Sequence, residues 1–97
     1  MWIGWVEFDL LLGDVHSLKA KRAVVRPILA DLKRRYEVSA AEVDHQDLHR
    51  RAVIGVGLVA ADSKHLVDVL DEADRFVAGR PEIELLSARR QLRHSDD

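Results

Sequence analysis

The chain has 97 residues, a formal net charge of -2 and no cysteine. This length supports one hydrophobic core but not two independent ones. The lack of cysteine excludes disulfides, thiolate metal sites and a thiol nucleophile. With 47% hydrophobic and 33% charged residues, the composition is that of an ordinary soluble protein, and we expect one domain over residues 1–97 in the cytoplasm.

The N-terminal apolar stretch, residues 2–12, alternates with a period of two, which predicts a strand with its even positions in the core. Glu7 and Asp9 interrupt it and no basic segment precedes it, so we expect neither a signal peptide nor a membrane span.

A helix is predicted next, with Ser17 as its N-cap. Its apolar stripe recurs at helical spacing through Val25, Ile28, Leu29, Leu32 and Tyr36. Pro27 removes a backbone donor inside it, so we expect a bend or a tightened first turn there.

Residues 38–44 and 52–61 favour two strands, which the polar stretch 45–51 joins as a hairpin. Asp62 and Ser63 can then cap a second helix that stops near Gly79. A last strand is expected over residues 83–92, with a frayed tail from about residue 93.

This order predicts an α+β, ferredoxin-like βαββαβ fold, with a four-stranded antiparallel sheet and two helices on one face. The other face is left open and is predicted to carry five apolar residues, Ile3, Trp5, Leu11, Val53 and Val59, among the charged Glu7, Asp9 and Arg51. Because a solvated face needs fewer apolar residues, we expect it to mediate homodimerisation.

Two motifs, His16–Arg22 (HSLKAKR) and Ala41–Leu48 (AEVDHQDL), followed by Arg51-Ala52 and Gly55-Val56, resemble the YlxP-like family of uncharacterised small bacterial proteins. The resemblance covers nearly the whole chain and implies a ferredoxin-like fold and a bacterial source. The family is itself a domain of unknown function. Its members are often encoded among genes for transcription elongation, translation initiation and ribosome maturation, which implies a connection with RNA or the ribosome.

Seven Lys or Arg and one acid lie between Ser17 and Tyr36, whereas residues 62–75 carry five acids and two bases. At 100° per residue, Lys19, Arg22, Arg26 and Lys33 fall within a sector of about 60°. With Ser17 and Lys21, this basic ridge is predicted to hold RNA phosphates, in ribosomal RNA or a ribosomal subunit. The alternative is that these side chains cover the edge of the core and pair with acids of the neighbouring helix.

The hairpin loop is a second candidate, as an interaction surface formed by Asp44, His45, Gln46 and Asp47. The loop could in principle bind a divalent ion or support acid–base catalysis. No second ligand cluster completes a tetrahedral set, and Asp residues in such loops commonly cap turns. We therefore predict no metal site, no catalytic residue and no cofactor.

The sequence Gly55–Ala60 (GVGLVA) matches G-x-G-x-x-A but lies inside a predicted strand, which is the wrong context for a dinucleotide site. We instead expect Gly55 and Gly57 to make room for Trp5. An RNA-recognition domain stacks bases on aromatic residues of both central strands, and here the third strand offers none.

We therefore expect a non-enzymatic RNA- or ribosome-associated binding module, and the sequence identifies no small-molecule substrate for it. The alternative is a structural or protein-interaction module that forms homodimers through the open face. A metal-dependent or acid–base enzyme centred on His45 and Asp47 is less favoured.

Overall fold

A computed structural model describes all 97 residues, Met1–Asp97. Its elements are β1 (Trp2–Leu12), α1 (Leu18–Tyr36), β2 (Ser39–Asp44), β3 (Arg51–Ala60), α2 (Ser63–Ala78) and β4 (Ile83–His94). The strands form one antiparallel sheet in the order β2-β3-β1-β4. The predicted ferredoxin-like βαββαβ fold is confirmed.

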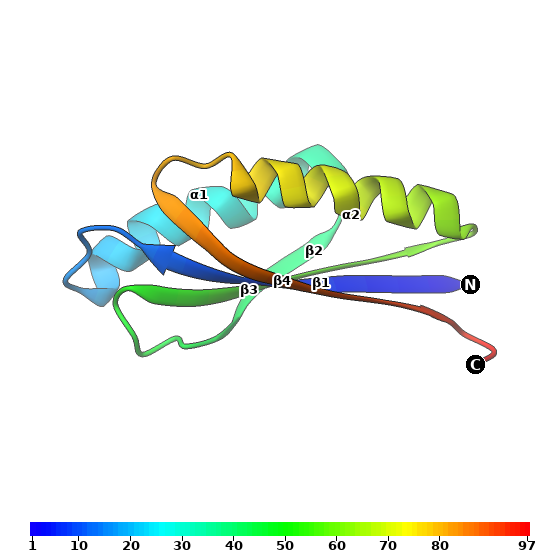
Figure 1. The fold of residues 1–97 in the computed structure, drawn as a ribbon, viewed down its shortest axis with the longest axis horizontal. Coiled ribbons are helices and arrows are strands. Elements are labelled where there is room, and N and C mark those ends of the chain that lie inside the picture. The colour runs from blue at the N-terminus through cyan, green and yellow to red at the C-terminus, as the bar shows by residue number, and fades with distance from the viewer.

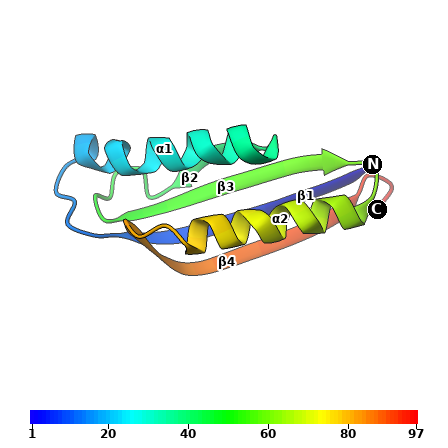
Figure 2. The ribbon, with the colours of Figure 1, turned by 90° about the horizontal axis from the view of Figure 1, so that it is seen from above.

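Both helices cover the same face of the sheet, and the other face carries none (Figure 1). Seen from the helical side, α1 lies over the β2 and β3 side and α2 lies over β1 and β4 (Figure 2). The β2–β3 loop lies at the same end of the sheet as the start of α1 (Figure 2).

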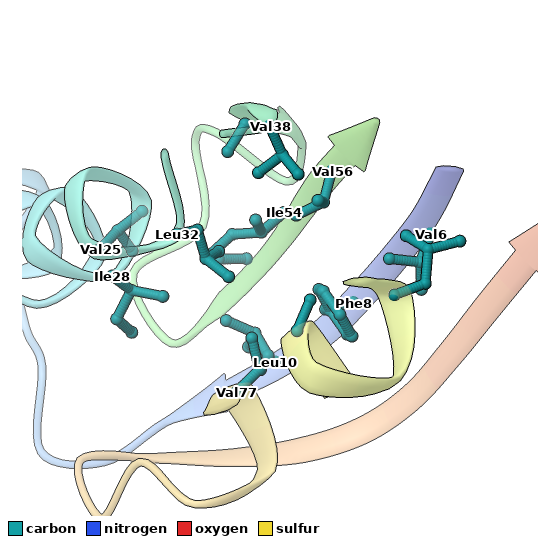
Figure 3. Packing of buried hydrophobic residues seen from close by; sticks show 14 of the residues in the cluster. Val6, Phe8, Leu10, Val25, Ile28, Leu32, Val38, Ile54, Val56 and Val77 are labelled. Carbon is teal, nitrogen blue, oxygen red and sulfur yellow. The ribbon is translucent and has the colours of Figure 1, made fainter. Parts of the chain in front are cut away.

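The core lies between the helices and the sheet and contains 17 buried residues. The even positions of β1 supply Val6, Phe8 and Leu10, which face Ile28 and Leu32 of α1 and residues of α2 (Figure 3). Burying a side chain of this size contributes about 1.5–3 kcal/mol. The period of two in β1 thus places one whole side of the strand in the core, as predicted.

The helix ends follow the capping signals in the sequence. The Ser17 Oγ accepts a hydrogen bond from the Ala20 N–H at 3.0 Å, and an Asp62 carboxylate oxygen accepts one from the His65 N–H at 2.8 Å. Helix α1 continues through Pro27 as one element, and α2 ends at Gly79. These two hydrogen bonds confirm the predicted N-caps. Each one satisfies a backbone amide of the first turn that would otherwise have no partner.

The last strand extends two residues beyond its predicted end at Leu92. The Ser95 N–H donates to the Met1 carbonyl at 2.8 Å, and the Met1 ammonium group donates to the Ser95 Oγ at 3.1 Å. These bonds hold the two ends of the chain side by side at one end of the sheet.

The open face differs from the prediction at two positions. Val53 is only 4% exposed, so it offers little surface to a partner, whereas Val59 is 61% exposed. A Cβ on Gly55 would come within 2.9 Å of Val43 Cγ1, so Gly55 makes room for β2 rather than for Trp5. The prediction failed because the register irregularity of β2 places Val43 over this glycine.

Candidate functional site

The two motifs that carry the family resemblance meet in space at Lys21. This side chain is 2% exposed and is the only buried charged residue of the chain. Its Nζ donates to the His45 carbonyl at 2.7 Å and lies 2.7 Å from Glu42 Oε2. One ammonium group thus joins the first turns of α1 to both β2 and the loop that follows it.

The loop is a turn held by its own polar groups. His45 has a positive φ of 57°, which is unusual for a residue with a side chain. Its N–H donates to Asp44 Oδ1 at 2.7 Å, and its carbonyl accepts from the Leu48 N–H at 3.0 Å as well as from Lys21. The Gln46 Nε2 donates to the Glu42 carbonyl at 3.0 Å. Lys21 therefore stabilises a strained turn.

Lys21 does not belong to the exposed ridge to which the sequence assigns it. Its burial and its two partners leave no ammonium surface for a phosphate. The position of Lys21 around the helix axis does not predict its burial, because the burial depends on contacts with Glu42 in β2 and His45 in the loop. Sequence reasoning did not single out Glu42, the acidic partner of Lys21, although it lies in the second of the two motifs.

The other four cations of the ridge are exposed on α1, and we call Lys19, Arg22, Arg26 and Lys33 the α1 ridge. None of the four takes part in an ion pair. The alternative predicted that these side chains cover the edge of the core and pair with acids of α2; the pairing is absent for all four. Asp71 and Asp74 of α2 instead accept from Arg90 of β4 at 2.8 Å and 2.7 Å.

The single acid of α1, Asp31, is engaged by cations outside the ridge. It accepts hydrogen bonds from Arg34 at 2.8 Å and from Arg80 at 3.3 Å. The hydrogen bond from Arg34, followed by the charges of Arg34, Arg80 and Arg35, holds the pKa of Asp31 below its usual 3.8 against the opposing effect of desolvation. Asp31 therefore stays ionised and committed to these arginines at neutral pH.

A cavity of about 290 Å³ lies where α1 faces β2 and the loop. Arg22 and Arg26 of the α1 ridge line it, together with Glu42 and Gln46 from the second motif. A second hollow of about 420 Å³ runs along the ridge itself and includes Lys19. The ridge is thus continuous with a concave surface.

The loop residues do not converge on a metal-binding geometry. Asp44, Asp47 and His49 are exposed, and no group of three or more His, Cys, Asp or Glu side chains could hold an ion. Asp44 instead supports the turn through the His45 N–H. Neither α1 nor α2 combines the length and the hydropathy that a membrane-spanning helix requires.

These features define a small α+β domain with a ferredoxin-like sheet, a cationic helix face and a cavity beside it. The chain belongs to the family described as protein of unknown function DUF503, whose model matches residues 3–90. The family description assigns no biochemical function, so the site must be interpreted from its own chemistry.

A curated relative, the uncharacterized protein YlxP of Bacillus subtilis (strain 168), is 33% identical over 82 residues, covering 84% of this chain and 89% of that protein. Among solved structures, a mutant of SnoaB, a cofactor-independent oxygenase from Streptomyces nogalater, matches with a TM-score of 0.46 and 13% identity over 99% of this chain and 94% of that one. This structural likeness is too low to support any functional comparison.

Replacing Lys21 by Met should destabilise the protein by about 2–3 kcal/mol, because it leaves the half-buried Glu42 carboxylate without its counter-charge and removes one donor from the His45 carbonyl. Urea unfolding measures the change. Lys64→Met is the matched control, since Lys64 pairs with Asp68 on the exposed face of α2 and should show little change. Equal stability of the two variants would contradict the role given to Lys21.

Proposed function

We propose that the protein is a non-enzymatic RNA-binding module whose α1 ridge contacts the phosphate backbone. The observation that carries the proposal is the absence of any acidic partner for Lys19, Arg22, Arg26 and Lys33 on one helix face. Arg51, Arg89 and Arg90 of the sheet are paired with carboxylates, whereas the exposed Arg75 and Arg93 are also unpaired but do not share one helix face. Unpaired, closely spaced cations are the groups that gain most from replacing counterions at a phosphate backbone.

The charge distribution favours a local contact rather than general attraction to nucleic acid. The whole chain carries a net charge of -2, so long-range attraction is weak. Binding then depends on seating the ridge directly against phosphates, with Ser17 at the start of the helix as a further polar contact. Such contacts position RNA without reading its sequence.

The YlxP-like resemblance supports ribosomal RNA or a ribosomal subunit as the partner, because genes of that family often lie among genes for translation and ribosome maturation. A cytoplasmic location follows from this proposed role. In this arrangement Gln46 of the loop, which lines the same cavity as Arg22 and Arg26, can add a polar contact, whereas the carboxylates of Asp44 and Asp47 repel phosphate.

The double variant Arg22→Ala/Arg26→Ala should bind single-stranded RNA roughly ten-fold or more weakly at low salt, because two phosphate contacts are lost. Fluorescence anisotropy with a labelled oligonucleotide measures the affinity. The slope of log affinity against log salt should fall by about 1.4, at about 0.7 per phosphate on a single strand.

The matched control is Arg75→Ala/Arg93→Ala, which removes the same charge from two exposed, unpaired arginines outside α1. It should bind RNA nearly as well as the wild type. Equal losses in the two double variants would show a non-specific charge effect and would remove the α1 ridge from the mechanism.

Self-association through the open sheet face is a second candidate function. Val59 and Val43 are 61% and 49% exposed, and a largely apolar hollow of about 320 Å³ beside Val43 includes Trp5. Exposed apolar surface of this kind is typical of an interface between protein chains. Ile3 and Val59 extend the same face along β1 and β3.

Val59→Asp should convert a dimer into a monomer, since it places a charge at the most exposed valine of the apolar face. Analytical sedimentation at micromolar concentration measures the oligomeric state. Leu86→Asp, at a 44% exposed position of β4, is the control and should leave the dimer intact. A wild-type protein that sediments as a monomer would rule out this candidate.

A further inference from the structure

The cavity between α1 and the β2–β3 hairpin has the size of a site for one base. Its volume of about 290 Å³ is just below that of small-molecule sites, which start at about 300 Å³. It can therefore hold a single planar group but not a stretch of oligonucleotide. Because Arg22 and Arg26 belong both to this cavity and to the α1 ridge, a chain bound on the ridge passes its opening.

One wall of the cavity is apolar. Leu18, Val25 and Leu29 of α1 line it. Leu18 and Leu29 remain partly exposed, whereas Val25 is 3% exposed and part of the core. An apolar wall of this kind accommodates the face of an aromatic ring and excludes water from it.

The opposite side offers hydrogen-bond acceptors. Glu42 Oε2 is fully enclosed and lies 2.7 Å from Lys21 Nζ, so the other oxygen, Oε1, is the one available to a ligand. Gln46 commits its Nε2 to the Glu42 carbonyl, which leaves its Oε1 as a free acceptor. The ligand edge that enters here must therefore donate.

The charge at the cavity comes from its rim. Lys21 and Glu42 form an ion pair and neutralise one another, whereas Arg22 and Arg26 have no acidic partner. The cavity thus combines an apolar wall, two acceptors and two cationic donors. A planar ring with N–H donors and an attached phosphate fits this combination: the ring packs on the apolar wall, its N–H groups donate to the acceptors, and the phosphate pairs with the arginines.

We infer that this cavity binds a guanine base of single-stranded RNA, with Arg22 and Arg26 holding the adjacent phosphate. Guanine presents N1–H and N2–H side by side on one edge, so it can donate to both Glu42 and Gln46. Uracil presents one N–H on that edge, and adenine and cytosine present an amino group beside an acceptor nitrogen that faces the carboxylate unfavourably. The inference rests on the proposed RNA-binding function and adds base selectivity to it.

Titration of the full-length protein with guanosine 5′-monophosphate, followed by backbone amide NMR shifts, tests the site without any RNA. The shifts should concentrate on residues 18–29 and 42–46, and the affinity should exceed that for uridine 5′-monophosphate by roughly five- to ten-fold, the value of one additional hydrogen bond. Equal binding of both nucleotides, or the same shifts with inorganic phosphate, would overturn base recognition.

Gln46→Leu removes one acceptor while keeping a side chain of similar size. It should lower the affinity for guanosine 5′-monophosphate roughly five-fold. The control Gln91→Leu, at an exposed position of β4, should leave this affinity unchanged. An unchanged affinity in the Gln46 variant would contradict the assigned acceptor and with it the inference.

Anisotropy with two oligonucleotides distinguishes this inference from the proposed function. If the protein binds oligouridine and a guanine-containing strand equally well, and Gln46→Leu changes neither, RNA binding stands and the base site is wrong. If neither strand binds and guanosine 5′-monophosphate still shifts the cavity residues, the nucleotide site stands and the RNA-binding function is wrong.

Discussion

The surface formed by the α1 ridge and the cavity beside it depends on one buried ammonium group, that of Lys21. Removing Lys21 from water costs several kcal/mol, which Glu42 and the His45 carbonyl offset by their contacts at 2.7 Å. The contacts fix the start of α1 against β2 and the loop, and they support the positive φ of His45. Because adjacent helix residues are 100° apart, directing Lys21 inward leaves Arg22 at the surface. The cavity and the α1 ridge both follow from this constraint.

The charge asymmetry between the helices has unequal consequences. The acids of α2 are partly neutralised by Arg90, which reaches Asp71 and Asp74 from β4. On α1 the single acid, Asp31, is bound by Arg34 and Arg80. The four cations of the α1 ridge, in contrast, have no acidic partner and share one helix face. That distinction carries the proposal of phosphate binding for a chain whose net charge is close to zero.

Local signals predicted most of the fold, because the period of the strands, the N-caps and the end of α2 at Gly79 each depend on residues that are close together in the sequence. Contacts between distant elements were not predictable in the same way. The burial of Lys21 requires the hairpin to approach α1, and the partner of Gly55 depends on an irregular register in β2. The ridge could be predicted because its cations share one helix face. The cavity could not, because its two sides come from separate motifs.

The most direct test of the account is a map of the protein surface that contacts RNA. Backbone amide shifts of the full-length protein with a short single-stranded RNA should be largest in residues 18–33 of α1 and in residues 42–48. Shifts concentrated instead at Trp5, Gly57 and Val59 would place RNA on the open sheet face, and would contradict both the α1 ridge and the cavity as the binding surface.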